Sequence, residues 1–219
     1  MKLQWQILSV VIFSTFVMMP AVAQTPHRRA ALNKPLQREL LRMEKDDQRY
    51  RQLIEDEMMS MSRAGTAIPS SRYPDIVRKQ DEIDSRNMAR LEEIIKGHGW
   101  PGKSLVGEEA AKAAFLILQH SDFARQQKYL PMLKVAAKSG EARPADAAML
   151  EDRVLVRQGK PQLYGTQLHS GPDTGGKLVL SPIEDEEHVD ERRSAVGLMP
   201  LAEYLKHFGL EYKPPASGH

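Results

Sequence analysis

The sequence predicts a mainly α-helical fold, a helical bundle that carries one small β-hairpin near its C-terminus. Apolar residues recur at three- and four-residue steps over most of residues 34–158. Clusters of glycine and proline divide that stretch into segments of helical length. After residue 160 the pattern changes to alternation around the turn-rich sequence SGPDTGG, which is typical of a hairpin.

The first residues predict a cleaved secretory signal peptide at residues 1–23. Lys2 provides a positive end, an apolar stretch follows from Ile7 to Met19, and the small residues Ala21–Ala23 precede a predicted cut before Gln24. The apolar stretch is too short to span a bilayer comfortably, although an uncleaved anchor helix is the alternative. We therefore expect a periplasmic or secreted protein with no membrane span after cleavage.

The rest of the chain is long enough for one domain with a buried core. We expect a flexible segment at residues 24–33, a single mostly helical domain at 34–210 and a disordered tail at 211–219. The net charge is +2, and basic and acidic residues are interspersed, so the chain lacks the charge pattern of a nucleic-acid-binding protein. It has no cysteine, which excludes disulfides, thiol catalysis and thiolate metal sites.

A long first helix is predicted after Asn33, a candidate N-cap, and the breaker-rich sequence SRAGTAIPSSRYP ends it. One apolar stripe follows this helix, with Asp47 as its polar exception. The stripe consists of Leu36, Leu40, Met43, Tyr50, Ile54, Met58 and Met61. We favour burial of the methionines at its end, whereas a partner surface would leave Met58, Met59 and Met61 exposed.

A second helix is predicted from about Asp75 to His98, where the sequence GHGWPG ends it. Asp84 and Asn87 lie near its apolar face, three residues apart. We expect both side chains to hydrogen-bond to a neighbouring helix. Trp100 is expected to pack at the junction that follows.

Three more helices are predicted before the hairpin. The sequence VGEEAAKAAFLILQHSD, at residues 106–122, is rich in alanine, which lets neighbouring helices approach closely and predicts a central position. Asp122 is a candidate cap for the next helix, which Pro131 is expected to bend or split. A fifth helix is predicted at residues 144–158.

The C-terminal part contains the predicted hairpin and two short helices. Its strands are expected at Gln162–Leu168 and Lys177–Leu180. A charged helix that ends at Gly197 is expected to expose Arg192 and Arg193 to solvent. Pro200 opens a last helix with one apolar face, formed by Leu201, Tyr204, Leu205 and Phe208.

No strong catalytic motif is present: the sequence has no phosphate-binding glycine loop, nucleophile-elbow pentapeptide or zincin helix. His120 follows the apolar run FLIL at a helix C-terminus, whose dipole favours a charged imidazole. It is the candidate acid or base, and the alternative is a histidine that seals the helix end. No two of the seven histidines stand at a metal-ligand spacing, so we expect no metal and no other cofactor.

Arg153 is a candidate anion-binding residue because its planar guanidinium suits a carboxylate or phosphate. It lies in the sequence MLEDRVLV, where it or its neighbour Asp152 must approach the apolar face. The alternative is a structural ion pair, with Asp84 or Asp122 as the partner.

The hairpin supplies the other candidate ligand-binding residues: Gln162, Tyr164, Thr166 and Gln167. On a strand, the first three share one face, and Gln167 lies on the other. Gly165 would let a second backbone or a ligand come close. The alternative is a solvated strand face whose amides bond across the hairpin.

Several short motifs occur in a recognisable order: GWP at 99–101, VG at 106–107, QHSD at 119–122, LEDR at 150–153, GKPQLYGTQ at 159–167 and GL at 197–198. In this order, over about residues 81–205, they resemble an uncharacterised bacterial family, the domain of unknown function catalogued as six-six-two-four. The resemblance implies membership of a family and no activity. It therefore assigns no catalytic residue.

Two hypotheses of function follow. In the first, the protein has a structural or protein-interaction role in the cell envelope, and its polar residues form a buried network that fixes the hairpin on the helices. In the second, it is a small-ligand-binding protein or hydrolytic enzyme, in which His120 is the acid or base and Arg153 holds a small polar ligand. One open cleft shared by His120, Arg153 and Tyr164 would favour the second hypothesis.

Overall fold

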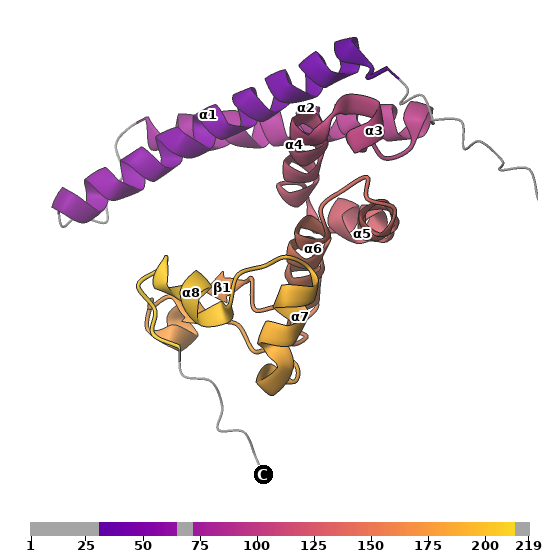
Figure 1. Ribbon diagram of the computed structural model, residues 1–219. Helices are drawn as coiled ribbons and strands as arrows, with labels where there is room; N and C mark the ends of the chain where they lie inside the picture. The colour runs from indigo at the N-terminus through magenta and orange to yellow at the C-terminus, as the bar shows by residue number, and fades with distance from the viewer. Residues whose placement is uncertain (1–30, 65–71, 213–219) are drawn as a thin grey trace, which may run out of the picture.

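The computed structural model describes residues 31–64 and 72–212 (Figure 1). The predicted signal peptide and its cleavage site, most of segment 24–33 and most of the tail lie outside the described residues. Its elements are α1 (Lys34–Ala64), α2 (Tyr73–His98), α3 (Lys103–Val106), α4 (Glu108–Gln119), α5 (Phe123–Lys138), α6 (Pro144–Arg157), β1 (Leu168–His169), β2 (Val179–Leu180), α7 (Val189–Ala195) and α8 (Leu201–Lys206). The predicted fold class, mainly α with a small hairpin near the C-terminus, is confirmed.

The helices α1 and α2 form a long antiparallel pair, and α4, α5, α6 and the C-terminal elements lie on one side of this pair (Figure 1). Helix α4 packs against both α1 and α2, and α5 packs against α6. The predicted central position of α4 is confirmed, because its four alanines are all buried. Among the described helices, none has the length and apolar character that a membrane crossing requires.

The main hydrophobic core lies where α4 meets its neighbours. Leu40, Leu91, Phe115, Leu118 and Leu133 come from four different helices, and each is almost fully buried. Burying one such side chain stabilises a fold by roughly 1.5–3 kcal/mol, so this cluster provides much of the driving force for folding. A second, smaller cluster joins Val189, Leu201 and Leu205 to the residues of the hairpin.

Several local predictions for the helices are confirmed. The Asn33 side chain accepts a hydrogen bond from Leu36 N at 3.1 Å, and Asp122 accepts one from Arg125 N at 2.9 Å, so both residues are N-caps. Pro131 does not split its helix, since α5 continues through it. The short helix α3 was not predicted; its four residues fill the turn between α2 and α4.

Two predictions of burial were wrong. The apolar stripe of α1 is buried at Leu36, Leu40 and Met43, but Met58 is 57% exposed and the adjacent Met59 is 53% exposed. The far end of α1 lies beyond α4, so the core does not reach it (Figure 1). Phe208 is likewise exposed, because α8 ends at Lys206.

The predicted strand Gln162–Leu168 was also wrong in extent. The hairpin is limited to Leu168–His169 paired with Val179–Leu180, and residues 163–167 form a loop. Gly165 adopts a φ of +67°, a left-handed conformation that a regular strand does not contain. The side chains of Gln162, Tyr164 and Thr166 therefore do not share a strand face.

Candidate functional site

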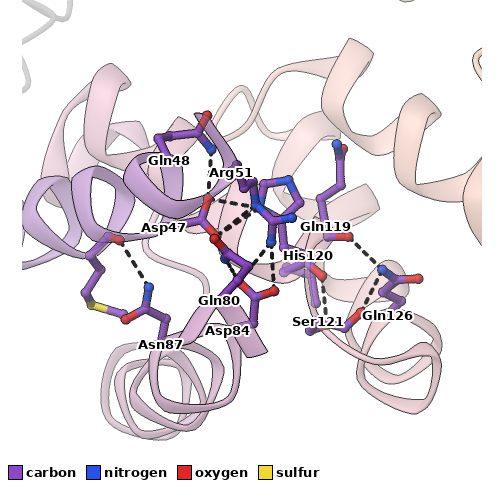
Figure 2. Close-up of polar contacts among 12 residues, drawn as sticks. Asp47, Gln48, Arg51, Gln80, Asp84, Asn87, Gln119, His120, Ser121 and Gln126 are labelled. Atoms are coloured by element: carbon purple, nitrogen blue, oxygen red, sulfur yellow. Dashed lines mark hydrogen bonds and ion pairs between the residues drawn. The ribbon is translucent and has the colours of Figure 1, made fainter. Parts of the chain in front are cut away.

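The site with the most distinctive chemistry joins His120, just after α4, to Asp47 in the middle of α1 (Figure 2). Nδ1 of His120 lies 3.0 Å from Oδ2 and 3.2 Å from Oδ1 of Asp47. Asp47 is 1% exposed, because it occupies a position of the apolar stripe and faces the core. A carboxylate in that position needs donors from its neighbours.

The other donors to Asp47 come from α1 and α2. Gln48 Nε2 donates to Oδ2 at 2.7 Å, Arg51 Nε to Oδ1 at 3.2 Å and Gln80 Nε2 to Oδ1 at 3.4 Å. Arg51 Nη2 also lies 2.8 Å from both carboxylate oxygens of Asp84. This network ties α1, α2 and the end of α4 together.

The charges in this network determine the ionisation of Asp47. Burial alone would raise the pKa of Asp47, but the hydrogen bond and charge of His120, together with Arg51, lower it to about 2. The pKa of Asp84 is raised by burial and by its contact with Asp47, against the charge of Arg51. Asp47 is therefore ionised at neutral pH, with His120 as one of its hydrogen-bond partners.

The second ring nitrogen of His120 remains available. Nε2 makes no hydrogen bond within residues 31–64 and 72–212, and the side chain is 15% exposed. A carboxylate beside Nδ1 fixes the orientation of the ring and leaves Nε2 as the nitrogen that can exchange a proton or bind a ligand. This pairing has the form of an acid–base group that is oriented by a third residue.

A surface cavity of about 290 Å³ lies beside His120. Its walls include Asp84 and Ser85 of α2, and Ser121, Asp122 and Arg125 around the turn between α4 and α5. Gln126 closes this turn, because its Nε2 donates to Gln119 O at 2.7 Å and to Ser121 O at 3.0 Å (Figure 2). The cavity is thus polar, and its walls are held in place.

Arg153 does not form either of the predicted ion pairs. Asp84 binds Arg51, and Asp122 binds Arg125. Nε of Arg153 is buried and has no hydrogen-bond partner in the described part of the chain. Burial and the charges of Arg157 and Arg51 lower the pKa of Arg153.

Gln162, Thr166 and Gln167 lie together in a network that is centred on Asp152. Asp152 Oδ1 accepts hydrogen bonds from Leu163 N at 2.7 Å and Tyr164 N at 3.0 Å, and Oδ2 accepts from Thr166 N at 3.0 Å and Thr166 Oγ1 at 2.9 Å. The loop is thus wrapped around a buried carboxylate of α6.

The amides of Gln162 and Gln167 complete this network. Gln162 Nε2 donates to Ser181 O at 2.8 Å and to Gln167 O at 2.9 Å, and its Oε1 accepts from Gln167 N at 2.8 Å. Gln167 Nε2 donates to Thr166 Oγ1 at 3.0 Å. Gln162 therefore links the loop to the segment that follows β2.

Tyr164 lies apart from His120. Its side chain lines a cavity of about 160 Å³ between α5 and α6, whereas His120 lines the cavity at the end of α4. No hydrogen bond or ion pair joins Arg153 to either residue within the described ranges. Among the predicted site residues, the structure brings Gln162, Thr166 and Gln167 together, and it separates His120 from Tyr164.

Sequence reasoning missed the acidic partners of both networks. Asp47 had a signal, as the polar exception on an apolar stripe, and Asp152 had one in its apolar surroundings. Arg193 was predicted on a solvated face, which was wrong. It is buried, donates to Tyr164 O and Met199 O at 2.6 Å each, and lies over the Tyr204 ring.

Comparison with known proteins identifies the family. Residues 34–213 match the model of a family described as "Family of unknown function (DUF6624)". The chain belongs to this family. The family resemblance of the short motifs is thereby confirmed, and their separate roles are visible: the LEDR and QLYGTQ motifs meet at Asp152, and the QHSD motif carries His120. No match was found among curated proteins or among solved structures.

Within residues 31–64 and 72–212, no three acidic or histidine side chains are grouped so that they could hold a metal ion. The side chains of His120 and Asp47 can themselves transfer a proton and form hydrogen bonds.

Proposed function

We propose that this protein is exported to the cell envelope and binds a partner protein through the far end of the α1–α2 pair. The observation that carries the proposal is the exposure of Met58 and Met59, at 57% and 53%, on a helix whose earlier apolar residues are buried. Methionine side chains are flexible and polarisable, and adapt to partner surfaces. Export is supported by the leader-like residues 1–23.

The α1–α2 pair is braced in a way that suits an arm carrying a contact surface. Asn87 Nδ2 donates to Met43 O at 3.1 Å, and Arg90 Nε donates to Glu39 Oε1 at 2.7 Å. Arg51 and Asp84 join the two helices further along. Because the helices are held to each other, the methionines at the end of α1 are presented on a preformed surface, which lowers the entropy cost of binding.

The polar groups of the loop support an interaction role over catalysis. Gln162 and Thr166 are buried, and both have hydrogen bonds within the protein. A group whose bonding capacity is used internally is poorly placed to orient a substrate. The same bonds hold the loop on α6, as expected for a structural network.

Site-specific photo-crosslinking tests the proposed arm surface. A photoreactive amino acid at Glu55, beside the methionines, should yield a discrete cross-linked product in intact cells. The double variant Met58→Glu, Met59→Glu should remove that product. The control Lys45→Glu, on the same helix, lowers the net charge by the same amount and should leave the product unchanged. Equal cross-linking with and without the methionines would refute the proposal.

N-terminal sequencing of the mature protein should find Gln24 first, and an intact residue 1 in the cytoplasm would refute export.

A second candidate function is binding or hydrolysis of a small polar ligand at His120. The free Nε2 of a histidine that is oriented by an ionised Asp47 favours it. N-acetylglucosamine and D-alanyl-D-alanine are suitable probes for thermal shift. Stabilisation of the wild type and of the exposed-site control His98→Gln, but not of His120→Gln, would support this function. No shift of the wild type, or an equal shift of all three proteins, would count against it.

A further inference from the structure

A groove with no lining residue in common with the His120 cavity has a second kind of recognition chemistry. It is the cavity of about 160 Å³ lined by Tyr164, by Ala147 and Ala148 of α6, by Lys134 and Lys138 of α5, and by Val196. The alanines leave the space empty, and the Tyr164 ring forms one wall. A cavity of about 150 Å³ is large enough for a benzene ring, so this one holds a single apolar side chain.

The wall formed by Tyr164 is held rigidly from both sides of its backbone. Tyr164 N donates to Asp152 Oδ1 at 3.0 Å, and Tyr164 O accepts from Arg193 Nη1 at 2.6 Å. Arg192 Nε also donates to the preceding carbonyl, Leu163 O, at 2.8 Å. The backbone that carries Tyr164 is thus fixed beside the groove before any ligand binds, which favours binding by preorganisation.

The rim of the groove is positively charged. Lys134 Nζ pairs with Glu151 Oε1 at 2.8 Å, whereas Lys138 has no ion-pair or hydrogen-bond partner within residues 72–212. Two ammonium groups against one carboxylate leave a single net positive charge. The Tyr164 hydroxyl, which also has no hydrogen bond in this part of the chain, adds a donor. These groups complement one carboxylate beside the apolar cavity.

Val135 of α5 is exposed and does not line the groove. Val135 is 67% exposed, the largest value among the large hydrophobic residues of the described chain, and it adjoins Lys134 in sequence. We propose that this groove binds the C-terminal residue of a partner polypeptide, with an apolar side chain in the cavity and the terminal carboxylate beside Lys138. The proposal goes beyond the arm surface and uses a separate part of the molecule, so either can fail alone.

The probes are the peptide acetyl-Gly-Ala-Phe with a free carboxylate, the same peptide as its C-terminal amide, and N-acetyl-L-phenylalanine. Binding to the mature full chain is followed by NMR shifts of backbone amides. We expect the free-acid peptide to shift Tyr164, Ala147 and Val196, and the amide to bind about tenfold more weakly, because it lacks the charge. The single residue carries the same side chain and carboxylate, so it should shift the same amides.

Variants assign the carboxylate to its partner. Lys138→Gln should weaken the free-acid peptide about tenfold and leave the amide unchanged, whereas the exposed-lysine control Lys79→Gln should change neither. Both positions are exposed, so folding is preserved. Equal affinity for acid and amide, or shifts that avoid Tyr164, would each overturn the proposal.

Discussion

Asp47 and Asp152 are two buried aspartates, 1% and 0% exposed, that satisfy their oxygens in different ways. Asp47 is surrounded by side chains of its own helix, of α2 and of the turn after α4, and two of these side chains, His120 and Arg51, are basic. Asp152 is surrounded mainly by the backbone N–H groups of one loop, with one hydroxyl. The first is balanced by charge, and the second by peptide dipoles.

The two surroundings have opposite effects on ionisation. The pKa of Asp47 is lowered to about 2, whereas burial raises the pKa of Asp152 against its hydrogen bonds from Thr166, Leu163 and Tyr164. Backbone donors leave the loop side chains free for other contacts, which is how Tyr164 comes to line a separate cavity. Side-chain donors are themselves committed to Asp47. In His120 only Nδ1 is used in this way, and Nε2 makes no hydrogen bond in the described part of the chain.

Removing Asp152 should have the largest effect on stability. In Asp152→Ala, three backbone N–H groups and one hydroxyl lose their acceptor, and unsatisfied buried donors cost roughly 1–3 kcal/mol each before water enters. We expect a loss of about 3–5 kcal/mol in the free energy of unfolding. Urea denaturation measures it, with the exposed Glu191→Ala as the control. If Asp152→Ala lost less free energy of unfolding than Asp47→Asn, Asp47 would be the more important of the two buried carboxylates.

Asp47 should contribute less, and its contribution should depend on pH. Its pKa is lowered in the folded protein to about 2 from 3.8, so its stabilisation is present above pH 3.8 and is lost as the pH falls towards 2. The shift corresponds to about 2 kcal/mol at neutral pH. Asp47→Asn should show this deficit in urea at pH 7, and the two proteins should converge near pH 2. A deficit that stays constant with pH would mean that charge is not its origin.

Gly165→Ala tests whether the loop around Asp152 depends on its backbone shape. Gly165 has a φ of +67°, and a Cβ there would lie 2.9 Å from side-chain carbons of Ile183 and Leu201. Strain and crowding together should cost about 1–3 kcal/mol. Thermal unfolding would measure it, with Gly175→Ala as the control, since that glycine has a similar φ of +61° and open space around it. Equal losses would assign the cost to φ alone.

Met58→Gln should have the smallest effect. The side chain is exposed, so removing its apolar surface should change the free energy of unfolding by less than about 0.5 kcal/mol. Calorimetry of the single variant measures it, and Leu40→Ala in the buried part of the same stripe is the contrast, with an expected loss of about 2–5 kcal/mol. Similar losses for the two variants would show that the end of α1 belongs to the core.

The helices could be predicted because their signals are local. Apolar spacing located α1, α2, α4, α5 and α6, and the caps Asn33 and Asp122 were legible from residue type. The predicted hairpin was too long because the alternating pattern of Gln162–Leu168 is typical of a strand. In the structure the backbone of this segment bonds instead to Asp152, ten residues before Gln162 in the sequence. Hydrogen bonds from four donor groups to one carboxylate outweigh the β-propensity of a short segment.

By itself, the sequence determined the family, the mainly helical class and the positions of the polar exceptions Asp47 and Asp152, because composition and periodicity are properties of the chain. Only the tertiary structure decided their partners. Asp47 and His120 are separated by 73 residues, and no local pattern couples them. The core also had to end before Met58, since burial depends on which helices reach that far. The free nitrogen of His120, the exposed methionines and the groove at Tyr164 all follow from that packing.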